Sequence, residues 1–180
     1  MELCPKAQDL FGYAEARIIS EAELWGGKIC AALDRQHPRD LFDIYNLLNT
    51  VGINSEIKNG FISLLLAGNR PLHEMLKPNF QMDEDIFDKE FAGMTDESFT
   101  FDEAKRTFLK LVENIHTILT DEDKRFLLDF VQLKANLQAA DISNLDKLPG
   151  IKWKLKNLEN LQNQNPEKFQ EQYDKLKISL

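Results

Sequence analysis

Five charged side chains in the stretch 28–43 are the best candidates for chemistry in this chain: Lys28, Arg35, Arg39, Asp40 and Asp43. Lys28 and Arg35 are seven residues apart, so they share a face if one helix carries both. Only small alanines lie between them on that face, which leaves room for an anion such as phosphate to meet two cations. Asp40 and Asp43 are three residues apart and point the same way on a second helix.

A purely structural interpretation of these residues is also available. An acid in the first turn of a helix complements the helix dipole by about 0.3–1 kcal/mol. An ion pair between Arg39 and Asp43, four residues apart, adds about 0.2–0.5 kcal/mol. Capping and salt bridging would then explain Arg39, Asp40 and Asp43 without any function. Lys28 lies near the apolar side of its helix, so it must either extend its ammonium to water or meet an acid.

Two helices joined by a tight turn are expected to carry these side chains. Ser20 and Glu23 form a capping-box pattern that begins the first helix, which should run to about residue 33. Gly26 and Gly27 inside it cost about 1 kcal/mol each relative to alanine, which suggests close approach of another backbone or a ligand. Pro38 suits the first position of the second helix. The expected buried stripe of that helix is Leu41, Ile44, Tyr45 and Leu48.

The rest of the chain predicts further helices and one extended piece. Capping residues and apolar spacing place helices at about 55–67, 70–76, 83–92, 101–119 and 121–137, then a loop at 141–150 and two amphipathic helices in 151–180. In the 83–92 helix, Ile86, Phe87 and Phe91 should face inward. Residues 14–19 read as a short strand without a partner. The predicted fold is therefore all-α, a multi-helix bundle-like domain with a short N-terminal extended segment. We divide it into an extended segment (1–19), a helical domain (20–150) and C-terminal helices packing on it (151–180).

Composition and charge exclude several classes of protein. The net charge is −8, all of it within the segment 81–104, so nonspecific DNA binding is not expected. The first twenty residues lack the apolar run of a signal peptide, and no segment is long and apolar enough to span a membrane. The two cysteines and three histidines show no metal-binding spacing. These features predict a cytoplasmic protein with reduced thiols and no membrane partner.

One further segment combines cations with an aromatic ring. Lys152, Trp153, Lys154 and Lys156 form a weak nucleic-acid signature. The leucines that follow at helical spacing explain the same segment as a packed helix, and we favour packing.

The stretch G-K-I-C-A-A-L-D-R-Q-H-P-R-D-L-F-D-I resembles the second half of the AbiEii-type nucleotidyltransferase toxins of bacterial abortive-infection and type IV toxin–antitoxin systems. That family carries a lysine on one helix and R-D-x-x-D on the next, here Lys28 and then Arg39, Asp40 and Asp43. The resemblance implies transfer of a nucleotide from a triphosphate to an acceptor, in some members a tRNA end. It implies phosphate binding by Lys28, and we add Arg35, from its spacing to Lys28, and Arg39 as further candidate phosphate-binding residues. It also implies a catalytic role for Asp40 or Asp43, Asp40 being slightly favoured, and use of Mg²⁺ to offset phosphate charge.

The resemblance also shows a departure from the family pattern. The family's glycine-rich turn after a strand and its Asp-x-Asp metal pair precede the lysine, whereas here the D-x-D letters are Asp83 to Asp85, after it and in helical surroundings. We therefore expect the helical C-terminal part of such a toxin, truncated or split from its sheet domain, with no metal site and no activity alone. Its expected partners are the missing nucleotidyltransferase domain, an antitoxin protein and RNA. The alternative is a non-catalytic helical module that binds protein or RNA.

Overall fold

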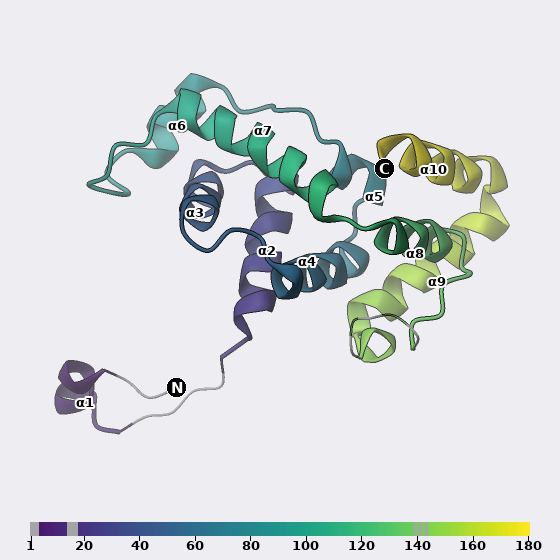
Figure 1. Ribbon diagram of the computed structural model, residues 1–180, viewed down its shortest axis with the longest axis horizontal. Coiled ribbons are helices and arrows are strands. Elements are labelled where there is room, and N and C mark those ends of the chain that lie inside the picture. Colours follow the sequence, from purple (N-terminus) through teal and green to yellow (C-terminus); the bar gives the residue numbers. More distant parts are fainter. Residues whose placement is uncertain (1–3, 14–17, 139, 141, 143) are drawn as a thin grey trace.

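The computed structural model describes residues 4–13, 18–138, 140, 142 and 144–180 (Figure 1). Within these residues the secondary structure is helical throughout and includes no strand, which confirms the predicted all-α class. The elements are α1 (Pro5–Phe11), α2 (Glu21–Asp34), α3 (Pro38–Asn49), α4 (Ser55–Ala67), α5 (Leu72–Leu76), α6 (Glu84–Phe91), α7 (Phe101–Ile118), α8 (Asp121–Val131), the 3-10 turn η1 (Leu145–Lys147), α9 (Pro149–Gln164) and α10 (Pro166–Ser179).

Local capping sets most helix starts, as the sequence predicts. Ser20 accepts the backbone N–H of Glu23 at 3.2 Å, and the Glu23 carboxylate accepts the backbone N–H of Ser20 in return. Thr100 caps α7 in the same reciprocal way with Glu103. Pro38 occupies the first position of α3, where its missing N–H costs nothing. These start signals are encoded within four residues, so they are independent of the rest of the fold.

Helices α2 and α4 cross in direct backbone contact at two glycines. A Cβ placed on Gly60 would lie 2.1 Å from the carbonyl oxygen of Ala22, and one on Gly26 would lie 2.5 Å from the carbonyl carbon of Gly60. The expectation of a close backbone approach is thus confirmed for Gly26. Gly27 does not share this role, because its nearest neighbour would be the Leu64 side chain at 3.6 Å.

An aromatic cluster joins α3, α6 and α7. Phe42 and Phe99 lie 5.2 Å apart between ring centroids, and Phe91 contacts both at 5.5 and 5.3 Å. Phe87 and Phe91 face this cluster as predicted. Ile86 does not: it is 44% exposed, because its position on α6 turns it to solvent, so its predicted inward orientation is wrong.

The C-terminal helices cover the end of α4. Helix α9 packs against α4, and α10 packs against α9, α5 and α8 (Figure 1). The predicted loop at 141–150 is wrong in its second half, where η1 forms and α9 begins at Pro149. The sequence Pro149-Gly150 is typical of a turn, but proline is also favoured at the first position of a helix, and here Pro149 occupies that position in α9.

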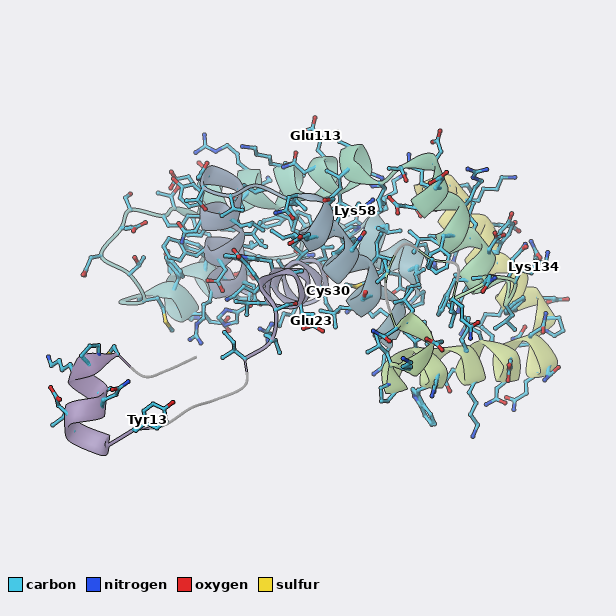
Figure 2. All side chains as sticks on the ribbon, turned by 60° about the horizontal axis from the view of Figure 1, so that its bottom comes forward. Tyr13, Glu23, Cys30, Lys58, Glu113 and Lys134 are labelled. Atoms are coloured by element: carbon cyan, nitrogen blue, oxygen red, sulfur yellow. The ribbon has the colours of Figure 1, made fainter. Side chains whose placement is uncertain are left out.

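Helix α1 is an element that the sequence did not predict. It lies apart from the helical body in both views, with Tyr13 near its end (Figures 1 and 2). Leu10, Ile18 and Ile19 in this region are 71%, 65% and 59% exposed. Residues 14–17 of the predicted strand lie outside the described residues, and residues 18 and 19 have no regular structure. Among the helices that the structure describes, none is long and apolar enough to cross a membrane.

Candidate functional site

The five candidate side chains lie on α2, on α3 and at the corner between them, and four of the five form two acid–base pairs. Lys28 pairs with Asp43, and Arg35 pairs with Asp40. The spacing argument had placed the two cations together and the two acids together. The corner instead sets α3 across α2, so that each cation meets an acid of α3 (Figure 1).

The Lys28–Asp43 pair connects the middle of α2 to the middle of α3. Both side chains are partly accessible, with 31% and 30% of their area exposed. The Lys28 ammonium also lies 6.0 Å from the centre of the Trp25 ring, one turn earlier on α2. Of the two predicted outcomes for Lys28, the one in which it meets an acid is therefore observed.

The Arg35–Asp40 pair closes the corner itself. The Arg35 guanidinium donates from Nε to one Asp40 oxygen at 2.6 Å and from Nη2 to the other at 2.9 Å. Only 8% of the Asp40 side chain is exposed, whereas 67% of Arg35 is. The hydrogen bonds and charge of Asp40 raise the pKa of Arg35 further above its usual value. This geometry ties the end of α2 to the first turn of α3.

Arg39 is outside both pairs. Its predicted partner Asp43 is taken by Lys28, and its guanidinium instead lies 3.5 Å from the Met94 sulfur. Arg39 is exposed at the surface of the corner. It is thus accessible to a ligand, and its cation has no carboxylate partner among the residues that the structure describes.

Sequence reasoning missed two residues that shape this corner. Gln36 has a positive φ of 52° and is buried, and its side chain joins the corner to the segment before α6 through Asn79 (2.7 Å) and Gln81 (2.8 Å). Nothing in the sequence indicates this bridge, since its partners are more than forty residues away. Trp25 was detectable, because it lies three residues before Lys28 and therefore on the same helical face.

No cluster suited to holding a metal ion occurs in the described part of the chain, where nowhere do three or more His, Cys, Asp or Glu side chains converge. Asp83, the first acid of the D-x-D letters, is the N-cap of α6 and accepts the N–H of Ile86 at 2.8 Å. Burial raises the pKa of the Cys30 thiol, which is packed against the core, to about 12 and makes it a poor nucleophile.

The two acids should differ in their effect on stability. Replacing Asp40 with asparagine is expected to lower the free energy of unfolding by about 2 kcal/mol, because a buried acceptor loses its bidentate arginine. Asp43→Asn, in a half-exposed pair, should cost less than about 1 kcal/mol. Urea denaturation of the two variants measures the difference. Equal losses would contradict the structural role of Asp40.

The fold and the site together define an all-helical protein in which a lysine–aspartate pair joins two helices. A family model described as "Nucleotidyl transferase AbiEii toxin, Type IV TA system" matches residues 1–157 of this chain. The chain therefore belongs to the AbiEii nucleotidyl transferase toxin family. Such a family implies use of a nucleotide and a metal in general, and an antitoxin as a partner. Neither the search of curated proteins nor the search of solved structures found a match.

Proposed function

We propose that this chain supplies the helical part of an AbiEii-type nucleotidyltransferase, in which Lys28 binds the triphosphate. The observation that carries this proposal is the Lys28–Asp43 pair, which joins the helix of the lysine to the helix of the R-D-x-x-D sequence. Both helices lie within the region matched by the family model.

The chemistry of the lysine suits this role. An ammonium has three N–H donors, and Asp43 uses one of them, so two remain for phosphate oxygens. In nucleotidyl transfer an acceptor oxygen attacks the α-phosphorus and pyrophosphate leaves. A lysine on the triphosphate offsets the negative charge of the leaving group. Asp43 is then a positioning residue, which holds the ammonium toward the open side of α2.

The two acids of the R-D-x-x-D sequence take different roles in this proposal. Asp40 is buried and fully engaged by Arg35, so it fixes the corner. Asp43 is accessible beside Lys28, which favours it over Asp40 as the acid nearest the substrate. Arg35 and Arg39 are exposed at the same corner and provide further cations for phosphate.

We further propose that a sheet domain with metal-binding carboxylates completes the site. The glycine-rich turn and the Asp-x-Asp pair of the family are the features that such a domain would contribute. The exposed apolar side chains Ile18 and Ile19, next to the start of α2, and Leu10 on α1 offer a surface for it. RNA, such as a tRNA end, is the proposed acceptor, and an antitoxin is the proposed regulator.

Calorimetric titration with the four ribonucleoside triphosphates and Mg²⁺ tests the role of Lys28. The wild-type chain should bind at least one of them, and Lys28→Gln should weaken that binding about tenfold or more, as expected for loss of a charge-assisted contact. Lys58→Gln is the matched control. It breaks another partly buried lysine–aspartate pair between helices, Lys58–Asp123 at 2.6 Å, away from the corner.

Two results would contradict the proposed role of Lys28. One is a folded wild-type chain that binds no triphosphate. The other is an equal loss of affinity in Lys58→Gln, which would trace the effect to stability. Circular dichroism of each variant establishes that the helices are intact.

If a second domain is needed to complete the site, the chain alone should be inactive, and this can be tested separately. The purified chain, given labelled triphosphate, Mg²⁺ and tRNA, should transfer no nucleotide. Addition of a separately expressed family sheet domain should restore transfer to the wild type but not to Lys28→Gln. Metal-dependent transfer by the chain alone would refute the requirement.

The N-terminal region favours one alternative, a non-catalytic interaction module. Its exposed leucine and isoleucines could pack against a second copy of this chain. Light scattering coupled to gel filtration decides between the two. A stable dimer that Leu10→Asp and Ile18→Asp disrupt supports the module, and a monomer supports the incomplete enzyme.

A further inference from the structure

A hollow of about 320 Å³ lies between α3 and α7, away from the Lys28–Asp43 pair. It is lined by Tyr45, Leu48, Asn49, Glu103, Arg106, Thr107 and Lys110. Tyr45 follows Asp43 by two positions on α3, which turns it to a different face of that helix. The volume is at the lower end of the range, about 300–1,000 Å³, that small-molecule sites occupy.

Two cations, Arg106 and Lys110, stand on the rim of this hollow, and the charge of Arg106 contributes to lowering the pKa of Glu103 beside it. Arg106 and Lys110 are four residues apart on one face of α7, and neither belongs to an ion pair in the described part of the chain. Lys28, Lys58 and Arg70, in contrast, are each paired with an aspartate.

The one carboxylate in the hollow is already engaged. Glu103 accepts the backbone N–H of Thr100 at 2.7 Å and its hydroxyl at 2.9 Å. The N–H bond is the main reason why the pKa of Glu103 lies below its usual value. Two cations against one committed acid leave the hollow with an excess of positive charge.

The wall opposite the cations is apolar and aromatic. The Tyr45 ring is held by Phe99, 5.2 Å away between centroids, so it is fixed in place before any ligand arrives. Leu48 extends the wall, and the exposed Asn49 amide can donate to and accept from a planar heterocycle. Anion-binding groups and an aromatic wall that line the same hollow match a ligand with a phosphate and a flat base.

We propose that this hollow binds a nucleoside phosphate, with Arg106 and Lys110 on the phosphate and Tyr45 and Leu48 against the base. The ligand is either a free mononucleotide or the terminal nucleotide of an RNA strand, since both present the same chemistry. The site is independent of the role proposed for Lys28, and it would give the protein a second contact with nucleotide or RNA.

Calorimetry with the four nucleoside monophosphates and with inorganic phosphate, and fluorescence anisotropy with a labelled four-nucleotide RNA, test the proposal on the full chain. Arg106→Gln/Lys110→Gln should weaken binding about tenfold or more, and added salt should weaken wild-type binding in the same direction. Lys89→Gln/Lys105→Gln removes the same charge from exposed sites outside the hollow and should leave affinity unchanged.

Comparison of the two measurements shows whether the ligand is a free mononucleotide or the end of an RNA strand. Tighter binding of the RNA than of any monophosphate, lost in the double variant, identifies an RNA end; the reverse order identifies a free nucleotide. Tyr45→Leu should weaken nucleotide binding and leave phosphate binding unchanged. The proposal is wrong if the wild type binds none of these probes, if both double variants lose affinity equally, or if Tyr45→Leu has no effect on nucleotide affinity in a folded chain.

Discussion

Replacing Gly60 with alanine should lower the free energy of unfolding by about 3 kcal/mol or more and the melting temperature by about 10 °C. The new Cβ would lie 2.1 Å from the carbonyl oxygen and 2.6 Å from the carbonyl carbon of Ala22. Both atoms belong to the backbone of α2, so no side-chain rotation relieves the clash. The two helices must move apart, which opens the core around Ile29 and Phe61.

Gly27→Ala is the matched control for this prediction. It adds the same methyl group within α2, but its nearest neighbour is a flexible leucine side chain at 3.6 Å. Alanine is the better helix former by about 1 kcal/mol, so Gly27→Ala should be neutral or stabilising. Urea denaturation of both variants gives the comparison. If the two variants behave alike, the close crossing of α2 and α4 is not what requires glycine.

Features encoded by near neighbours could be predicted from the sequence. The capping boxes at Ser20, Thr100 and Thr120 begin α2, α7 and α8, and Asn165 with a following proline begins α10. The prediction of helices from the sequence was wrong where the local signals were ambiguous. The Pro-Gly pair before residue 151 is equally suited to a turn and to a helix start, and only the packing of α9 on α4 selects the helix.

The candidate site shows the same division between local and tertiary information. Its five residues could be selected from their types and spacing, but their pairing could not. Spacing along one helix favoured Arg39 as the partner of Asp43, a bond worth only about 0.2–0.5 kcal/mol. The tight corner brings Lys28 to Asp43 instead and frees Arg39. That corner depends on Gln36 in a left-handed conformation, which no local pattern predicts for glutamine.

Lys154→Met should be the second large destabilisation, about 2–3 kcal/mol near neutral pH. Lys154 is 8% exposed, and its ammonium donates to the carbonyls of Gly68 (2.9 Å), Asn69 (3.2 Å) and Arg70 (2.5 Å) at the end of α4. These carbonyls belong to the three residues that directly follow α4, and Lys154 of α9 supplies a donor to each of them. Methionine keeps the apolar stem of the side chain but leaves the carbonyls without it. Lys152→Met, on the exposed side of α9, is the matched control and should change stability by less than about 0.5 kcal/mol.

The difference in the free energy of unfolding between the wild type and Lys154→Met should depend on pH. This pH dependence distinguishes an effect of the charged ammonium from an effect of side-chain packing. Burial lowers the pKa of Lys154 to about 8 from the ordinary value of 10.5. Between these two values the unfolded chain binds more protons than the folded chain, so folding gains stability as the pH rises. Groups common to both proteins cancel in the comparison, and the advantage of the wild type over Lys154→Met should therefore grow from pH 8 to about pH 10.5. A difference that stays constant over this range would mean that the lysine has an unshifted pKa in the folded chain and that the carbonyl cluster, rather than burial, dominates its environment.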